Sequence, residues 1–379
     1  MSKYLKGLAV LGAMTLVVTA CGSRPTESNQ SEGSDKTNSA SPQAGAKDFR
    51  ACMVSDSGGF DDKSFNQTSY KGLLDAKKEL GVSSSTAESK SDGDYPKNVG
   101  GMVDAKCNVI VTVGFKLGDQ TAISASENPT IKFGIVDYDI KATDLKKTNL
   151  KEVPTNVKSL LFNTAQSSFL AGYLAAGMSK SGKVGTFGGL PIPTVTIFMD
   201  GFWEGVQYFN QQKKKNVQVL GWNETTQKGL FTNDFENKAQ GKNTASNLIS
   251  QGADIVFPVA GPAGLGGLEA AKASGGKVNA IWVDTDGCVS APEYCNVLLT
   301  SVDKGMDVAV QDVITTSFQD KFDNTPYVGT LDNGGTGLAP YHEWDSKIPA
   351  DLKAEIDQLK KDIIDGKIAI KSKVQPQSQ

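Results

Sequence analysis

Short apolar runs alternate along the chain with longer segments in which apolar residues recur at helical spacing. Continuous apolar runs of this length are typical of strands in parallel sheets that are buried on both faces. Bounded by turn-forming residues, they predict strands at 50–55, 109–113, 132–136, 159–163, 183–187, 217–221, 255–259, 279–283, 297–301 and 327–331. The segments between them predict helices at 67–80, 95–106, 118–127, 165–178, 200–212, 239–251, 264–274, 304–321 and 350–365.

This alternation predicts an α/β fold with doubly wound parallel sheets that carry helices on both faces. The strands are too numerous for one comfortable sheet, so we expect two lobes joined by a hinge that the chain crosses more than once. We place residues 48–162 and about 288–325 in the first lobe, and residues 163–287 and about 326–379 in the second. A single large α/β enzyme domain is the alternative.

The N-terminal residues predict where the protein is located. Lys3 and Lys6 precede a short apolar run, residues 7–18, which ends in Val18-Thr19-Ala20-Cys21. A basic start, an apolar run too short to span a bilayer comfortably and small residues before a cysteine are typical of a lipoprotein signal peptide. We therefore expect residues 1–20 to be removed and Cys21 to carry a lipid. An ordinary signal peptide with a chance cysteine, or an apolar anchor helix, are the alternatives.

Residues 21–47 are rich in Ser, Thr, Asn, Gly and Gln and carry few large apolar side chains. Such a segment cannot bury enough surface to offset the entropy lost on ordering. We expect a flexible tether that links a globular body to a lipid anchor on the extracytoplasmic face of the cell membrane.

Charge and histidine content limit the functions available. The net charge is -3 with 21% charged residues, so no footprint for nucleic acid is visible. The chain has one histidine, His342, and neither a G-x-S-x-G elbow nor an H-E-x-x-H motif. We therefore expect no catalytic residues and no cofactor. A metal site is not expected either, because no C-x-x-C spacing occurs.

Four cysteines remain once Cys21 is set aside, and they allow three pairings. We favour Cys52–Cys107, because Cys52 lies in the first strand and Cys107 directly precedes a strand that is its neighbour in the common doubly wound order. We also favour Cys288–Cys295, which closes a short loop. An oxidising compartment permits both bonds, and free buried thiols are the alternative.

The stretch between the first strand and the first helix carries the clearest binding signal. Residues 56–66 read Asp-Ser-Gly-Gly-Phe-Asp-Asp-Lys-Ser-Phe-Asn. A loop at the carboxyl end of a strand, followed by a helix N-terminus, is where open α/β sheets bind small ligands. Its two glycines and one lysine do not have the glycine-rich run ending in Gly-Lys that a phosphate loop needs, so we expect a neutral, ring-containing ligand rich in hydroxyls. We interpret Asp61 and Asp62 as helix-capping acids, and Asn66 as structural.

Segments along nearly the whole mature chain resemble the basic membrane protein family, the lipoprotein substrate-binding subunits of ABC importers for nucleosides. The resemblance rests on segments that occur in the family's order: 61–66, 132–137, 169–176, 182–189, 201–206, 252–257, 260–264, 280–284 and 300–304. It implies the two-lobed architecture of type I periplasmic binding proteins.

The resemblance also implies a ligand site. Phe65 matches the family aromatic that stacks on one face of the base, and Phe231 matches the aromatic from the other lobe. Asp56, Ser64 and Asp137 match positions that hydrogen-bond the ligand near the first lobe. The family often has a longer amide at the Ser64 position, and a serine reaches less far.

On the ribose side, Gly261, Asp284 and Lys304 match the group that holds the sugar hydroxyls. A carboxylate that accepts from two vicinal hydroxyls forms charge-assisted bonds, which are the strong kind. A nearby ammonium group keeps such a carboxylate ionised.

The sequence therefore predicts a monomeric, lipid-anchored receptor that captures a nucleoside, with a purine nucleoside favoured. Hinge closure would trap the ligand, and an ABC transporter permease would receive it. A binding protein for a sugar or another hydroxyl-rich ligand is the first alternative. A secreted nucleoside hydrolase and a surface sensor or adhesin of the same fold are the others.

Overall fold

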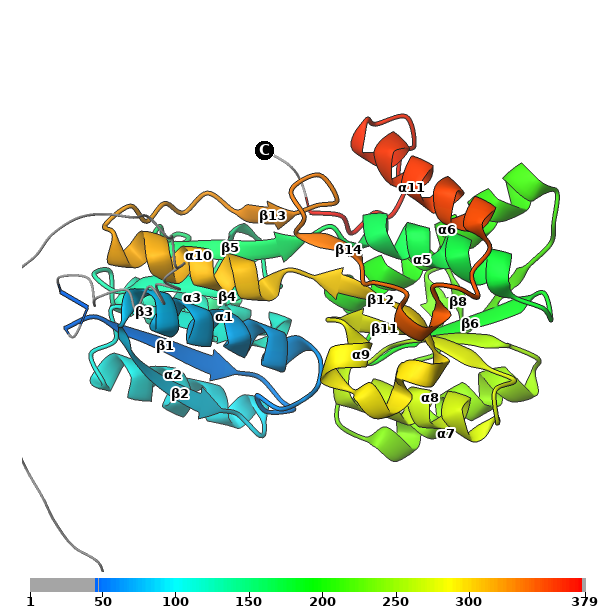
Figure 1. The fold of residues 1–379 in the computed structure, drawn as a ribbon. Helices are drawn as coiled ribbons and strands as arrows, with labels where there is room; N and C mark the ends of the chain where they lie inside the picture. The colour runs from blue at the N-terminus through cyan, green and yellow to red at the C-terminus, as the bar shows by residue number, and fades with distance from the viewer. Residues whose placement is uncertain (1–44, 47, 377–379) are drawn as a thin grey trace, which may run out of the picture. The chain divides into compact units, whose positions relative to one another are not determined.

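Two six-stranded sheets organise the protein (Figure 1). The computed structural model describes residues 45, 46 and 48–376, which belong to one compact unit that begins at Pro42. The predicted signal peptide, the lipidation site at Cys21 and nearly all of the predicted tether lie outside the described residues. Within the described residues, no helix has the length and apolar character needed to cross a membrane.

The first sheet has the strand order β13-β5-β4-β3-β1-β2, and all its neighbouring strands are parallel. In that order the strands are Tyr327–Gly329, Val157–Phe162, Lys132–Val136, Val109–Val113, Arg50–Ser55 and Ser83–Glu88. Side chains alternate between the faces. Ala51 and Met53 pack under helices α1 (Phe65–Leu80) and α10 (Met306–Phe318), whereas Cys52 and Val54 pack under α2 (Tyr95–Asp104) and α3 (Gly118–Glu127).

The second sheet has the order β14-β12-β11-β10-β6-β7. Its strands are Thr336–Leu338, Leu298–Lys304, Asn279–Asp284, Ile255–Val259, Lys183–Gly188 and Gln218–Leu220. All pairs are parallel except β12 with β14. A short hairpin, β8 (Trp222–Asn223) and β9 (Lys228–Gly229), follows β7.

Helices also cover both faces of the second sheet. In Figure 1, helices α5 (Thr164–Met178) and α6 (Pro193–Lys213) lie on one face, and α7 (Lys238–Ser250) and α8 (Gly261–Ala273) on the other. Helix α11 (Ala350–Ile364) packs on α5. Helices α5 and α6 pack closely at Gly172 and Gly205. A Cβ atom at either glycine would overlap the backbone of the facing helix, so only glycine fits there. The short helices are α4 (Leu145–Thr148), α9 (Gly287–Ser290), η1 (Asp92–Asp94), η2 (Phe115–Leu117), η3 (Ile140–Ala142), η4 (Pro292–Val297) and η5 (His342–Trp344).

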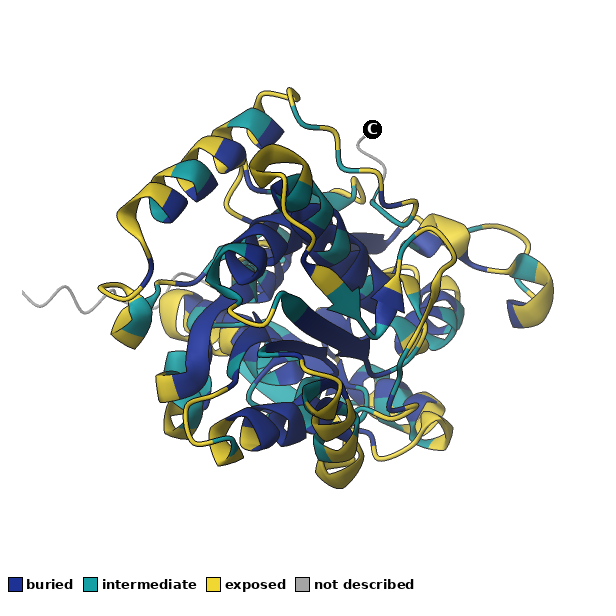
Figure 2. Cartoon of the chain, turned by 90° about the vertical axis from the view of Figure 1, so that its right-hand side faces the viewer, coloured by how far each residue is buried: buried dark blue, intermediate teal, exposed yellow. Residues whose placement is uncertain are grey.

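Figure 2 shows the strands largely buried, with exposed residues on the outward faces of the helices and on loops. This is the burial that two doubly wound parallel sheets require. The predicted fold class, α/β with two parallel-sheet lobes, is confirmed.

Two of the predicted lobe boundaries are wrong. The chain passes between the sheets at Asn163, at Gly305 and across residues 330–335. Residues 298–304 therefore belong to the second sheet, although we expected them in the first lobe, and β13 pairs with β5 in the first sheet rather than lying in the second lobe. Strands of similar apolar character fit either sheet, so only pairing partners decide the assignment.

Local patterns located most elements but missed a few. Strand β2 has the sequence Ser-Ser-Ser-Thr-Ala-Glu and lies at a sheet edge, so it lacks the apolar run used to find strands. Helix α6 begins at Pro193 rather than near residue 200, because proline suits the first turn of a helix.

Both predicted disulfides form. Cys52 in β1 pairs with Cys107, just before the neighbouring strand β3, with a Cα–Cα distance of 6.0 Å. Cys288 pairs with Cys295 with a Cα–Cα distance of 4.6 Å.

Candidate functional site

A cavity lies where the carboxyl ends of strands from both sheets meet. It encloses about 640 Å³ of space that protein atoms do not occupy, part of it open to solvent. The predicted ligand residues that line it are Asp56, Phe65, Asp137, Gly261, Asp284 and Lys304. The predicted residues Ser64 and Phe231 are not in its lining.

Each lining residue is positioned by the end of a strand or the start of a helix. Asp56 follows β1 and Asp137 follows β4. Asp284 and Lys304 are the last residues of β11 and β12, and Gly261 begins α8 after β10. Carboxyl ends of parallel strands meet at one edge of a sheet, which explains why residues so distant in sequence converge.

Asp137 and Asp284 both have left-handed backbone conformations, with φ of 66° and 70°. Such values are uncommon outside glycine, although Asp and Asn tolerate them better than most residues. The backbone thus turns sharply at the end of each strand and leaves the carboxylate at the cavity wall. Each side chain is only 7% exposed.

Lys304 is the central cation of the site. It is 3% exposed, and its Nζ donates to Asp137 Oδ2 at 2.5 Å. The ammonium also lies over aromatic rings, 5.0 Å from the centroid of Phe65 and 5.3 Å from that of Phe162. Burial raises the pKa of Asp137, and the positive charge of Lys304 opposes that shift. The same two causes act on the pKa of Asp284.

Asp56 differs from these two acids. Burial raises its pKa to about 8, and the side-chain amide of Asn66 partly opposes that shift. At neutral pH the carboxyl is therefore mostly protonated and can donate a hydrogen bond to a ligand acceptor. Its carboxyl lies against Gly114, where any Cβ would overlap it.

Asp62 is a capping residue, as the sequence predicts. Its carboxylate accepts from the backbone N–H groups of Ser64, Asn66 and Gln67 at 2.9–3.0 Å, at the N-terminus of α1. Burial nevertheless raises the pKa of Asp62 to about 6. Its side chain also borders the cavity, so capping and cavity lining are combined in one acid.

Phe231 packs elsewhere. Its ring makes an edge-on contact with Trp222, at a centroid distance of 6.0 Å, and its backbone bridges to Gly188. The aromatic that lines the cavity from this segment is Phe235. Both phenylalanines lie in one irregular stretch, so no periodicity in the sequence distinguishes the ring that faces the cavity.

Other lining residues escaped the sequence analysis. Asn66 lines the cavity, although we interpreted it as structural, and its amide also donates to the carbonyl of Ser57 at 3.0 Å. Lys116 and Phe198 line it as well. Lys116 lies in η2, three residues after the end of β3, and its place near the carboxyl end of a predicted strand was a usable signal. Phe198 lies inside helix α6, and nothing in the local sequence indicates that its ring lines the cavity.

Ser64 is fully buried beside the cavity. Its Oγ donates to Asp284 Oδ2 at 2.6 Å. We expected this serine to bond a ligand directly, and the structure instead places its hydroxyl against an acid of the other lobe.

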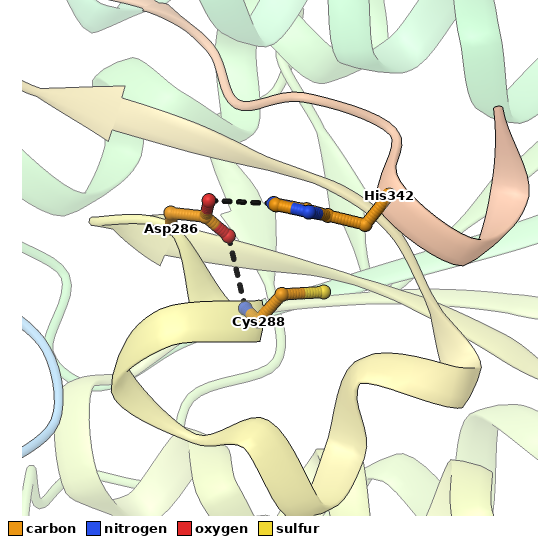
Figure 3. Close-up of side chains that lie close together, drawn as sticks. All are labelled: Asp286, Cys288 and His342. Atoms are coloured by element: carbon orange, nitrogen blue, oxygen red, sulfur yellow. Dashed lines mark hydrogen bonds and ion pairs between the residues drawn. The ribbon is translucent and has the colours of Figure 1, made fainter.

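A separate cluster could in principle ligate a metal: Asp286, Cys288 and His342 (Figure 3). The sulfur of Cys288 is already bonded to Cys295, so it offers no thiolate. Asp286 accepts from the backbone N–H of Cys288 at 2.9 Å and pairs with Nε2 of His342 at 2.6 Å. The cluster caps α9 and ties it to η5.

Two parallel-sheet lobes with a polar, aromatic-lined cavity between strand ends define a solute-binding protein of the type I periplasmic class. Residues 49–373 match the family described as "Bmp: ABC transporter substrate-binding protein PnrA-like". The chain belongs to this family. It is therefore a substrate-binding component of an ABC transporter system, and the family is one of solute-binding proteins rather than enzymes.

The chain is similar to several named proteins. The chain is 32% identical to the "CD4+ T-cell-stimulating antigen" of Listeria innocua, over 98% of each chain. It is 29% identical to the "ABC transporter nucleoside-binding protein BmpA" of Lactococcus lactis, over 95% of this chain and 97% of the relative. An ABC transporter solute-binding protein from Aeropyrum pernix shares the fold, with a TM-score of 0.75 and 24% identity over 87% of this chain and 94% of that one.

Proposed function

We propose that the protein captures a nucleoside, with a purine nucleoside favoured, and delivers it to the permease of an ABC transporter. The observation that carries the proposal is the cavity itself. It combines aromatic side chains from both lobes, Phe65 and Phe235, with the carboxyl groups of Asp56 and Asp284. The name of the Lactococcus lactis relative points to the same ligand class.

In this proposal the base lies against Phe65 and Phe235. Stacking of a base on an aromatic side chain contributes roughly 1–3 kcal/mol per contact. The protonated carboxyl of Asp56 donates to an acceptor on the base edge. Asn66, which lines the same wall, supplies an amide for the same edge.

The ribose hydroxyls then bind at Asp284 and Gly261, on the side of the cavity formed by the second lobe. Asp284 accepts from them, and charge-assisted bonds of this kind are stronger than those between neutral groups. Gly261 opens helix α8 with a φ of 50° and lines the cavity with its backbone. The absence of a Cβ there lets a sugar approach the helix N-terminus closely.

The charges of the cavity disfavour a phosphate. Acidic side chains line it at positions 62, 137 and 284, against two lysines, Lys116 and Lys304, whereas the protonated Asp56 adds no charge. Lys304 is already paired with Asp137. A nucleotide would bring its anionic group next to acids without a free buried cation, so nucleosides are favoured over nucleotides.

Delivery requires the receptor to stay close to its permease. The predicted lipid on Cys21 and the polar tether at 21–47 would keep it at the extracytoplasmic face of the membrane. The ligand would be released when the lobes open against the permease.

The test is a thermal-shift panel on the full chain carrying Cys21→Ser. Inosine, adenosine, guanosine, uridine, free bases, AMP and galactose are compared. A ligand at 100 times its dissociation constant stabilises the fold by roughly 2.7 kcal/mol, and we expect this for nucleosides. No response to any nucleoside would refute the proposal, and a response to galactose alone would favour the sugar-binding alternative.

Two controls sharpen this panel. Phe65→Leu should reduce the nucleoside shift, whereas Phe318→Leu should not, because Phe318 packs against Phe49 in the first lobe. Chromatography of the incubated nucleosides should show no free base. Release of base would identify a hydrolase instead.

A further inference from the structure

Direct contacts between protein atoms join the two lobes beside the cavity. Ser64, in the first-lobe loop before α1, donates to Asp284 of the second sheet. The indole N–H of Trp282 donates to the backbone carbonyl of Lys63 at 3.2 Å. Gly58 of the same loop lies close to Pro262: a Cβ atom on Gly58 would be 3.4 Å from the proline ring. The loop therefore contacts the second lobe directly, through protein atoms alone.

The Ser64–Asp284 bond is the strongest of these contacts. It joins a hydroxyl to a buried carboxylate at 2.6 Å, and hydrogen bonds to charged groups contribute more than neutral ones. In the part of the chain that the structure describes, no other side chain donates a hydrogen bond to Asp284. Ser64 thus fixes one carboxylate oxygen, Oδ2, and leaves Oδ1 for a ligand.

The serine is itself held rigidly. Its backbone N–H donates to Asp62, and its carbonyl accepts from the backbone N–H and the hydroxyl of Thr68. A side chain with one rotatable torsion on a backbone fixed at both ends has little freedom to lose when the lobes meet. The contact is therefore built into the start of helix α1.

We propose that Ser64 is a positioning residue that orients the Asp284 carboxylate for the ligand and favours lobe closure before a ligand arrives. This proposal rests on the proposed nucleoside specificity only in that inosine is the probe used to test it. The apparent affinity of a binding protein rises with the fraction of molecules already in the binding-competent state. A ligand-independent contact across the cleft raises that fraction.

The first readout is the distance between the lobes without ligand. Labels are placed by Lys90→Cys and Lys238→Cys, two exposed positions on opposite lobes that border the same surface hollow. The full chain carries Cys21→Ser, so that the added cysteines label selectively. We expect Ser64→Ala to shift the ligand-free distance distribution toward longer distances.

The second readout is the dissociation rate of inosine. Loss of a hydrogen bond to a charged group should raise it roughly ten- to a hundredfold. Ser69→Ala is the matched control, because Ser69 is an equally buried serine of α1 whose hydroxyl bonds within the first lobe, to the carbonyl of Phe65. It should change neither readout.

A double-mutant cycle tests whether the effect of Ser64→Ala comes from loss of its hydrogen bond to Asp284. Ser64→Ala, Asp284→Ala and the double variant should open the ligand-free protein to the same extent, because each breaks the same contact. If Ser64→Ala leaves the ligand-free distances unchanged, or Ser69→Ala shifts them as much, the proposal is wrong. The ligand-free distances do not depend on nucleoside binding. Failure of this proposal can therefore be distinguished from failure of the proposed function.

Discussion

The two walls of the cavity each present a buried aspartate, and these aspartates differ in their partners. Asp137 of the first lobe and Asp284 of the second end their strands with the same left-handed backbone and are equally buried. Asp137 is paired with the ammonium of Lys304, whereas among the described residues the one side chain that donates a hydrogen bond to Asp284 is the hydroxyl of Ser64. Two acids at equivalent strand ends therefore differ in role because their hydrogen-bond partners differ. Asp137 balances the charge of Lys304, and we propose that Asp284 keeps one carboxylate oxygen for a ligand.

The largest effect is expected from Lys304→Met. It removes the cation that offsets the burial of both aspartates. Breaking a buried ion pair typically costs about 3–5 kcal/mol in the free energy of unfolding, a loss that urea denaturation of the variant would measure. Lys116→Met is the control, because its partner Asp92 is 66% exposed, and such a pair contributes about 0–1 kcal/mol. Equal losses in the two variants would contradict the assignment of Lys304 as the central cation.

The two aspartates should respond differently to removal of their charge. Asp284→Asn should weaken inosine binding by about 1.5–3 kcal/mol, measured by titration calorimetry, with a modest change in stability. Asp137→Asn should lower the free energy of unfolding more, because it leaves the buried ammonium of Lys304 without its partner. If Asp137→Asn proved the milder variant in urea, the division of roles would be reversed.

Asp56 gives the third test, through pH. Its folded pKa of about 8 exceeds the unfolded value, so the folded protein holds the proton while the unfolded chain has lost it. Stability from this group is present below the unfolded pKa and falls as pH rises toward 8. The slope is at most about 1.4 kcal/mol per pH unit.

Asp56→Asn should remove that slope, because the amide keeps a donor and does not titrate. Urea unfolding of both proteins at pH 5, 6 and 7 measures the difference. Other acids with raised pKa values, such as Asp303 and Glu204, contribute equally to both proteins and cancel. Parallel pH profiles would show that Asp56 is ionised in the folded protein.

The smallest effect separates Phe235 from Phe231. Phe235→Leu should weaken inosine binding by about 1 kcal/mol, the lower part of the range for aromatic stacking. Phe231→Leu should leave binding nearly unchanged and lower stability, because its ring packs on Trp222. Calorimetry and urea unfolding of both variants decide which ring faces the ligand. Loss of binding in Phe231→Leu alone would restore the expectation from the sequence.

Most of the first-lobe wall was predictable because its signals are local. The loop at 56–66 follows an apolar strand, Asp62 caps the helix that comes next, and Phe65 begins that helix. The second-lobe wall was less accessible. Phe231 and Phe235 share one irregular segment, and the contacts of each ring come from strands and helices distant in sequence.

The amino-acid pattern predicted the alternation of strands and helices and the two-lobed class, it favoured the disulfide pairings that form, and it supplied most of the candidate residues at the strand ends. The elements and the cysteine pairings follow from periodicity and strand order, which act over short stretches of chain, whereas Asp137, Gly261, Asp284 and Lys304 were implied by the family resemblance. Only the tertiary structure decided which sheet received residues 298–304, which phenylalanine faced the cavity and what Ser64 touched. Ser64 and Asp284 are 220 residues apart. Their hydrogen bond exists because two separately folded sheets bring their strand ends together, and no local pattern in the chain encodes that meeting.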